Sequence, residues 1–258
     1  MSRVQPRALV RAPSPLLAEG IVTHIDRSPV DVDVAREQFS AYCAVVEAAG
    51  WQLREVEPAP DHPDSVFVED TVVVCDDLAV LTRCGDDRRR GELVGVERAL
   101  AGLGMELARI EAPATLDGGD VLQVGTTVYV GRSGRTNSEG IRQLGRLLHP
   151  RGRTVVPVRL GAVLHLKSAA TALPDGTMLV RSDHWAAGAL PHPRVVVEEA
   201  GCHVVPLGGD EVLISAAAPR TAAELADLGF VPRVVDISEF EKLEGCVTCL
   251  SVLLPGTG

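Results

Sequence analysis

The chain is 258 residues long, and 46% of its residues are hydrophobic while only 3% are aromatic. This length suits one α/β domain, and a core built from Val, Leu, Ile and Ala favours strands packed against helices. The formal net charge of -10 argues against nucleic acid or an anionic membrane as the main partner, because both require clustered Lys and Arg. A cationic ligand fits this charge better, although many proteins are acidic only for solubility.

The N-terminal residues lack the apolar segment of a secretory signal, and no apolar run is long enough to span a membrane. We therefore expect a protein of the reducing cytoplasm whose cysteines carry free thiols. Each cysteine is then either a packing residue or a reactive one, and most should be packing residues. The six are Cys43, Cys75, Cys84, Cys202, Cys246 and Cys249.

Apolar residues at helical spacing predict a helix over residues 33–49, with Asp33 as its N-cap and Gly50 after its end. Three more helices are predicted over residues 93–103, 136–148 and 221–228. The last two open with the motif Thr-x-x-Glu, at Thr136 and Thr221. This motif is typical of a capping box, in which two side chains satisfy the free amides of the first turn.

Short β-rich runs between these helices predict strands over residues 72–74, 79–81, 121–122, 128–130, 155–156, 178–180, 195–197, 204–205, 212–214, 234–235 and 250–254. Each helix is followed by one strand and then by a pair, with a period of roughly 45 to 55 residues. About five such units fill the chain, which is typical of a solenoid or propeller. The unit that should have its helix within residues 183–193 is the least regular, because it contains two prolines. A duplicated ordinary α/β sheet is the alternative.

Two acidic clusters are candidates for a binding site. In the first, alternation predicts a strand with Val66 and Val68 on one face and carboxylates near its ends. The second is the sequence Asp-Gly-Gly-Asp over residues 117–120. Its glycines would let the backbone approach a ligand closely, but the same sequence is equally compatible with an ordinary hairpin turn.

One histidine and one cysteine could carry chemistry. His165 lies in an apolar stretch, where a histidine is either a satisfied core residue or an acid/base. The histidines show no spacing typical of a metal site, so zinc is not expected. Cys246 and Cys249 form a C-x-x-C motif, but a strand and not a helix follows it, which argues against a thioredoxin-type redox site. The remaining possibilities for Cys249 are an activated thiol or a packing residue.

Five separated motifs, taken in order, resemble the dimethylarginine dimethylaminohydrolase family. They are PDSVFVED over residues 63–70, LDGGDVL over 116–122, RTN over 135–137, LHLKS over 164–168 and TCLSVL over 248–253. The resemblance covers essentially the whole chain. It implies the pentein fold of the guanidino-group-modifying superfamily, an α/β propeller of five ββαβ blades, with residues 1–258 as a single catalytic domain. This agrees with the repeat.

The resemblance also implies roles for ten residues. The catalytic ones are Cys249 as nucleophile, His165 as general acid and then base, and Asp117 as the carboxylate that helps to hold the guanidinium and to orient the histidine. The substrate-binding ones are Asp64, Glu69 and Asp70 for the amine and guanidinium, Arg89 and Arg135 for the amino-acid end, Ile21 as a lid contact, and Leu243 through its backbone carbonyl. Asp117 is a shorter side chain than the Glu of some bacterial relatives, so direct contact with His165 is left open.

The implied reaction is hydrolysis of methylated arginine to citrulline and a methylamine through a covalent thiouronium on Cys249. No cofactor or resident metal is implied, and the implied partner is the small-molecule substrate alone, bound by a monomer or homodimer. Zinc bound to Cys249 and His165 could act as an inhibitor. The alternatives are an arginine or agmatine deiminase of the same superfamily and a non-catalytic propeller such as the ribosome anti-association factor of this fold.

Overall fold

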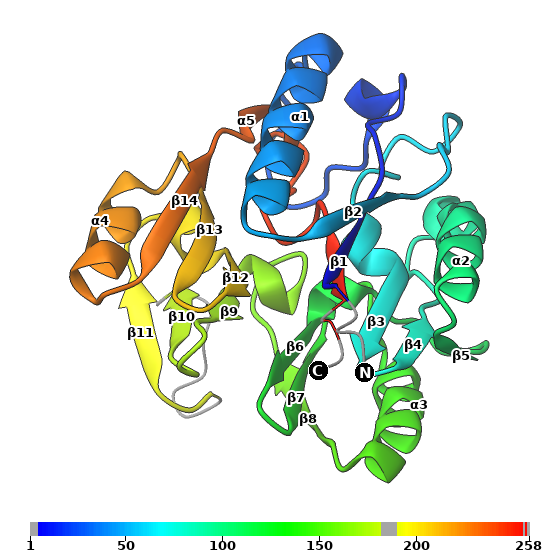
Figure 1. Ribbon diagram of the computed structural model, residues 1–258. Coiled ribbons are helices and arrows are strands. Elements are labelled where there is room, and N and C mark those ends of the chain that lie inside the picture. The colour runs from blue at the N-terminus through cyan, green and yellow to red at the C-terminus, as the bar shows by residue number, and fades with distance from the viewer. Residues whose placement is uncertain (1–4, 182–189, 255, 257–258) are drawn as a thin grey trace.

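The computed structural model describes residues 5–181, 190–254 and 256, and it contains five three-stranded sheets set around a common axis (Figure 1). This arrangement confirms the five-bladed α/β propeller that the repeat and the resemblance predict. Within the part of the chain that the structure describes, no helix combines the length and apolar character needed to cross a bilayer.

Each blade has an antiparallel pair of strands and a third strand parallel to the second, and in four of the blades the described residues include a helix before that third strand. The second blade shows it plainly, with β3 (Val72–Cys75), β4 (Leu78–Leu81), α2 (Leu93–Gly102) and β5 (Glu106–Arg109). The first two strands need only a tight turn, whereas the parallel third strand needs a crossover, which the helix provides. Alternating hairpins and helices in the sequence follow from this geometry.

The other blades follow the same plan. The third contains β6 (Val121–Val124), β7 (Thr127–Arg132), α3 (Ser138–Leu148) and β8 (Thr154–Arg159); the fourth contains β9 (Ala170–Ala172), β10 (Met178–Arg181) and β11 (Pro193–Val196); the fifth contains β12 (Val204–Gly208), β13 (Glu211–Ser215), α4 (Pro219–Asp227) and β14 (Val231–Val235). The helix expected within residues 183–193 lies mostly outside the described residues.

The first blade joins the two ends of the chain. It contains β1 (Arg7–Val10), α1 (Val32–Ala48) and β2 (Gln52–Glu55), and its innermost strand is β15 (Val252–Leu254) from the other end of the chain. Strand β15 pairs antiparallel with β1, with Leu9 opposite Val252. This pairing closes the ring and carries the preceding residues, including Cys249, to the axis.

The innermost strands of the blades face one another at this axis. Strand β15 lies beside β3, and β9 lies beside both β6 and β12. Helices α1 to α4 lie on the outside of the ring (Figure 1). Loops at one end of the axis therefore come together from several blades, although they are far apart in the sequence.

Two predicted local features are wrong in detail. Helix α1 begins two residues earlier than expected, because Asp31 and not Asp33 is the N-cap and accepts hydrogen bonds from the amides of Asp33 and Val34. The capping boxes do not form either. Asn137 caps α3 by accepting from the Gly140 amide, and Thr221 lies inside α4, where its hydroxyl donates to Glu198.

The strand expected around Val66 and Val68 is also wrong. This segment is a series of turns that leads into the short 3-10 helix η2 (Val68–Thr71). The Phe67 amide donates to the Asp64 carbonyl and the Thr71 hydroxyl to the Val68 carbonyl, so the backbone is satisfied locally and not by a neighbouring strand. Consecutive side chains here therefore do not alternate between two faces, as they would in a strand.

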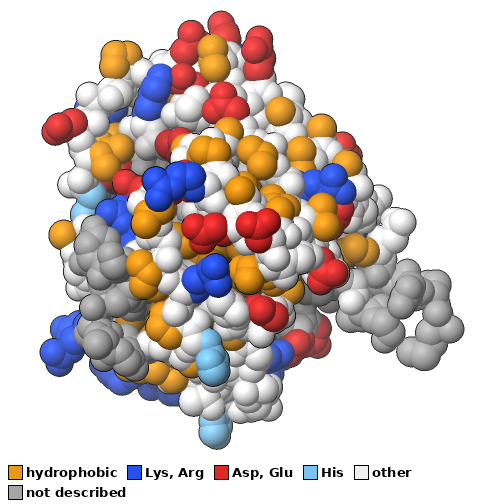
Figure 2. Space-filling model, turned by 90° about the vertical axis from the view of Figure 1, so that its left-hand side faces the viewer, with side chains coloured by type: hydrophobic (Ala, Val, Ile, Leu, Met, Phe, Trp, Pro, Cys, Tyr) orange, Lys and Arg blue, Asp and Glu red, His pale blue; other side chains and the backbone are white. Residues whose placement is uncertain are grey.

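The distribution of charge on the surface agrees only in part with the expectation that an acidic protein avoids nucleic acid. On the face that Figure 2 shows, basic side chains are scattered among acidic and hydrophobic ones, and acidic side chains gather at the end where α1 lies in Figure 1. A mixed surface of this kind is what solubility requires. The exclusion of nucleic acid as a partner stays a prediction.

Candidate active site

A small pocket at the axis brings together eight of the ten predicted site residues. Those that line it are Ile21, Asp64, Asp70, Arg89, Arg135, His165, Leu243 and Cys249. They come from loops of different blades, so only ring closure assembles them. Of the remaining two, Asp117 lies directly behind His165, and Glu69 points elsewhere.

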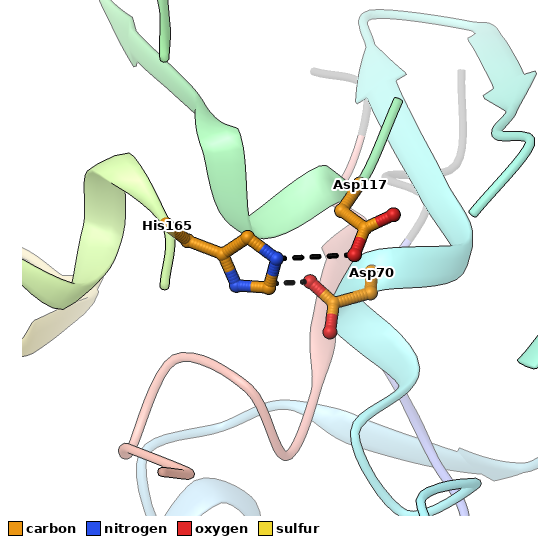
Figure 3. Close-up of side chains that lie close together, drawn as sticks. All are labelled: Asp70, Asp117 and His165. Atoms are coloured by element: carbon orange, nitrogen blue, oxygen red, sulfur yellow. Dashed lines mark hydrogen bonds and ion pairs between the residues drawn. The ribbon is translucent and has the colours of Figure 1, made fainter. Parts of the chain in front are cut away.

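His165 lies between two buried carboxylates (Figure 3). Its Nε2 is 3.1 Å from Oδ2 of Asp117, and its Nδ1 is 3.8 Å from Oδ1 of Asp70. Asp117 is fully buried, and its other oxygen accepts the Gly85 amide at 2.8 Å. The shorter aspartate therefore does reach the imidazole, and it holds the ring in one orientation.

The Asp-Gly-Gly-Asp sequence forms the 3-10 helix η4 (Gly118–Asp120) and not a hairpin turn. A Cβ atom on Gly118 would lie 2.0 Å from the Glu69 carbonyl oxygen, and one on Gly119 would lie 2.6 Å from Nδ1 of His165. The Gly119 amide donates to Oδ1 of Asp70 at 2.9 Å. A side chain at either position would collide with the Glu69 backbone or with the His165 ring, so both positions require glycine.

Asp120 also supports the site, a role that the motifs did not predict. Its Oδ1 accepts the Leu166 amide at 2.9 Å, directly after His165, and its Oδ2 accepts the Ser133 hydroxyl at 2.6 Å. Burial raises the pKa of this carboxyl to about 6. The second carboxylate of the Asp-Gly-Gly-Asp motif was the signal that could have identified it.

The carboxylates around His165 change its protonation. Burial alone would lower the pKa of His165, but the charges of Asp70 and Asp120 and the charge and hydrogen bond of Asp117 raise it to about 9. Conversely, burial alone would raise the pKa of Asp70, but His165 and Arg89 and the Gly119 amide hold it at about 2. Near neutral pH the imidazole is therefore protonated and lies beside the ionised carboxylate of Asp70.

This raised pKa predicts a pH dependence of stability. The unfolded histidine has a pKa of about 6.5, so the native state holds an extra proton between that value and about 9. The stabilisation by His165 is therefore complete below about pH 6.5 and is lost as the pH rises through about 9. Urea unfolding at about pH 6 and about pH 9.5 should show a loss on the order of 3 kcal/mol that is absent in His165→Gln. An equal loss of unfolding free energy between the two pH values in both proteins would contradict the raised pKa of His165.

The guanidinium of Arg89 lines the pocket, but most of its N–H groups donate to other groups of the protein. Its Nη1 is 2.5 Å from Oδ2 of Asp70, and its Nε and Nη2 donate to the two carboxylate oxygens of Glu92 at 3.0 and 2.9 Å. Nη2 also donates to the carbonyl oxygens of Asp64 and Phe67. Among the described residues Nη1 donates to Asp70 alone, which leaves one of its hydrogens for a ligand.

Arg89→Ala is expected to lower the free energy of unfolding by about 3 to 5 kcal/mol, because Asp70 and Glu92 would remain as buried, unpaired carboxylates. Chemical denaturation measures this loss. The control is Arg88→Ala, which removes a neighbouring arginine with 71% of its side chain exposed and should change stability by less than about 0.5 kcal/mol. A similar small change in both variants would mean that Arg89 is not structural.

Asp64 and Arg135 also line the pocket. Asp64 is buried, and its Oδ1 accepts the Ile21 amide at 3.0 Å, which ties the first loop to the pocket. Nη1 of Arg135 lies 3.9 Å from Oδ2 of Asp117. The loop is held from its other side by Glu244, whose carboxylate accepts the amides of residues 23–25.

Cys249 ends a tight turn and lines the pocket. Its amide donates to the Cys246 carbonyl at 3.0 Å, and its own carbonyl accepts the Glu69 amide at 3.2 Å. Hydrogen bonding to Cys246, burial, and the charges of Glu69 and Asp70 all raise the pKa of the Cys249 thiol. A cation bound in the pocket would offset these effects and favour the thiolate.

Glu69 is not brought to the pocket. Its Oε1 lies 2.5 Å from Nζ of Lys167, and its Oε2 accepts the Thr248 hydroxyl at 2.8 Å. Because residues 68–71 form a 3-10 helix, Glu69 and Asp70 point in different directions. Glu69 instead lines a separate cavity with Lys167 and Thr248, where its hydrogen bond to Thr248 can hold the turn of Cys249 in place.

Three donor atoms of the site could approach a metal ion together. Those of Asp70, Asp117 and His165 lie within 4.8 Å of one another. Both carboxylates already accept protein hydrogen bonds, from Gly119 and Gly85 respectively. The carboxylates of Asp70 and Asp117 are therefore already bound by the protein groups that hold them beside the imidazole.

A buried thiol, an imidazole between carboxylates and a five-bladed propeller together define an enzyme of the guanidino-group-modifying class. No protein-family model matches the sequence. A Streptomyces coelicolor protein named N(G),N(G)-dimethylarginine dimethylaminohydrolase is 55% identical over 249 residues, which is 96% of each chain. The chain therefore belongs to the dimethylarginine dimethylaminohydrolase family.

Solved structures agree with this assignment. One, a dimethylarginine dimethylaminohydrolase with a His-to-Gly substitution in an adduct with S-methyl-L-thiocitrulline, has a TM-score of 0.91 and 31% identity and is matched over 97% of this chain and 100% of its own. A Cys-to-Ser variant of the Pseudomonas aeruginosa enzyme in complex with citrulline has a TM-score of 0.88 and 31% identity, over the same shares of the two chains.

Proposed function

We propose that this protein hydrolyses N-omega-methylated arginines to citrulline and methylamines. The observation that carries the proposal is one pocket in which Cys249, His165 and the buried carboxylate Asp70 meet, in a chain 55% identical to a relative named for this activity. A guanidinium is a planar cation, so its burial requires carboxylates to balance the charge. Residues 1–258 would act as one catalytic domain.

In the proposed first half-reaction, Sγ of Cys249 attacks the guanidinium carbon, and His165 donates its proton to the departing amine. The high pKa of His165, about 9, suits this order, because the histidine enters the cycle as an acid. The carbon–nitrogen bond breaks, dimethylamine or methylamine leaves, and a thiouronium remains on the sulfur.

In the second half-reaction, the neutral His165 takes a proton from water, which attacks the thiouronium carbon. The carbon–sulfur bond breaks, citrulline is released and the thiolate returns. Asp117 holds the imidazole at 3.1 Å through both steps.

We propose that the amino-acid end of the substrate is bound by Asp64, Arg135, Ile21 and the Leu243 carbonyl, together with the one remaining N–H of Arg89. The six cysteines are all free, which fits a reducing cytoplasm.

An assay of the ureido product, which is citrulline from dimethylarginine, monomethylarginine and arginine and carbamoylputrescine from agmatine, tests the proposal with a chelator present. The two methylated arginines should be turned over with the highest kcat/KM. Agmatine lacks the carboxylate that Arg135 would bind, and the loss of one charged hydrogen bond corresponds to about 1.5 to 3 kcal/mol, or roughly 10- to 100-fold. Release of ammonia from arginine or agmatine, with no amine from dimethylarginine, would indicate a deiminase instead.

A further inference from the structure

A second thiol, which the proposed reaction does not use, lies next to the nucleophile. Sγ of Cys246 is 3.3 Å from Sγ of Cys249, and it is 3.2 Å from the Thr248 hydroxyl. Cys246 is buried, whereas Cys249 lines the pocket. The pair is not a thioredoxin-type site, because the chain continues into β15 and not into a helix.

The backbone between the two cysteines is already compatible with a disulfide. The Cys249 amide donates to the Cys246 carbonyl, three residues earlier, and such a turn brings the two Cα atoms within about 7 Å. Disulfides span Cα distances of about 4.4 to 6.8 Å and have a sulfur–sulfur bond of about 2 Å. The sulfurs therefore have to approach by little more than 1 Å, which side-chain rotation can provide.

The reactivity of Cys246 also fits a second step. Its hydrogen bond with Cys249 lowers the pKa of Cys246 well below the ordinary thiol value, and the charge of nearby His203 acts in the same direction. By contrast, burial raises the pKa of Cys43 to about 12. The thiolate is the form that attacks oxidised sulfur.

We propose that Cys246 is a resolving cysteine, which forms a reversible disulfide with Cys249 when the nucleophile is oxidised by a hydroperoxide. The proton of Cys249 passes to Sγ of Cys246 along their 3.3 Å contact, and the resulting thiolate of Cys249 attacks the terminal peroxide oxygen. The oxygen–oxygen bond breaks, a sulfenic acid forms, and the leaving oxygen takes a proton from solvent to give an alcohol or water. Sγ of Cys246 then attacks the sulfenic sulfur, the sulfur–oxygen bond breaks, and the leaving hydroxide takes the Cys246 proton and departs as water.

The disulfide would turn the enzyme off without destroying it. Cys249 has no thiolate while it is bonded to Cys246, so no thiouronium can form. Two equivalents of a thiol reductant return both thiols and are themselves oxidised to a disulfide. Without a resolving thiol the sulfenic acid is open to further, irreversible oxidation. The effect on activity rests on the proposed function, whereas disulfide formation does not.

Peptide mapping of the intact enzyme tests the proposal directly. Trypsin cleaves after Lys242, so both thiols lie on one peptide, residues 243–258. After reduction, removal of the reductant, treatment with hydrogen peroxide and alkylation, this peptide should lack two hydrogen atoms and carry no alkyl group. Citrulline formation should fall by at least about tenfold and return with dithiothreitol.

Two variants separate the resolving role from general oxidation. Cys246→Ala should remain active when reduced, but peroxide should inactivate it permanently, with sulfinic acid at Cys249. Cys43→Ala, which removes a more exposed thiol, should behave as the wild type. Sulfinic acid on Cys249 of the wild type, or none on Cys249 of Cys246→Ala at the same peroxide concentration, would overturn the proposal. A reduced protein that forms the disulfide but never makes citrulline would instead contradict the proposed function.

Discussion

Cys249→Ser is expected to lower kcat for dimethylarginine by about a thousandfold or more. A serine hydroxyl is far harder to ionise than a thiol, and the carboxylates that surround position 249 would disfavour an alkoxide further. The pocket's other contacts remain, so the dissociation constant for substrate should change by less than about tenfold, or 1.4 kcal/mol. Citrulline formation and calorimetric titration measure the two quantities separately.

A matched replacement shows whether the effect belongs to this thiol. Cys43→Ser changes a partly exposed cysteine on α1 that does not line the pocket, and should leave turnover intact. The citrulline complex of a Cys-to-Ser relative supports the expectation that a serine variant still binds ligand. Substantial turnover by Cys249→Ser would require another nucleophile.

His165→Gly is expected to lower turnover of dimethylarginine by about 10²- to 10⁴-fold, because the amine leaves only when it is protonated. S-methyl-L-thiocitrulline changes this requirement, since a thiolate leaves without a proton. Cys249 of the variant should therefore still attack S-methyl-L-thiocitrulline, but the variant lacks the base that activates water. A covalent adduct on Cys249 should accumulate and be visible by mass spectrometry of the intact protein.

The expected adduct follows from the geometry and has a precedent in the adduct of a His-to-Gly relative with the same compound. His149→Ala is the control, because His149 is an exposed histidine at the end of α3. It should turn over dimethylarginine normally and accumulate no adduct. A normal rate in His165→Gly would remove this histidine from the mechanism, and an absence of adduct would place it in the attack step instead.

The repeat and most of its elements were predictable from the sequence, because helical periodicity and short β-branched runs are local signals. Strands β3, β4, β6, β7 and β10 lie within a residue or two of their predicted positions. Strands β1, β2, β5 and β9 were missed, since they are short and, in β2 and β5, carry charged residues at their ends. Their pairing depends on a neighbour in the sheet and not on their own pattern.

The motifs likewise identified the thiol, the histidine and the acidic clusters, and the resemblance assigned them roles. Motif order alone could not say which of two adjacent carboxylates faces the pocket. The structure places Asp70 in the pocket and pairs Glu69 with Lys167 and Thr248 instead.

Only the tertiary structure decided which groups touch. Asp117 reaches His165, 48 residues away, and Glu92 joins Asp70 around Arg89. The pairing of β1 with β15 closes the ring and brings the turn of Cys246 and Cys249 to the axis. Local sequence encodes periodicity and turn chemistry, but the direction of a side chain in an irregular loop depends on segments that fold against it from elsewhere in the chain.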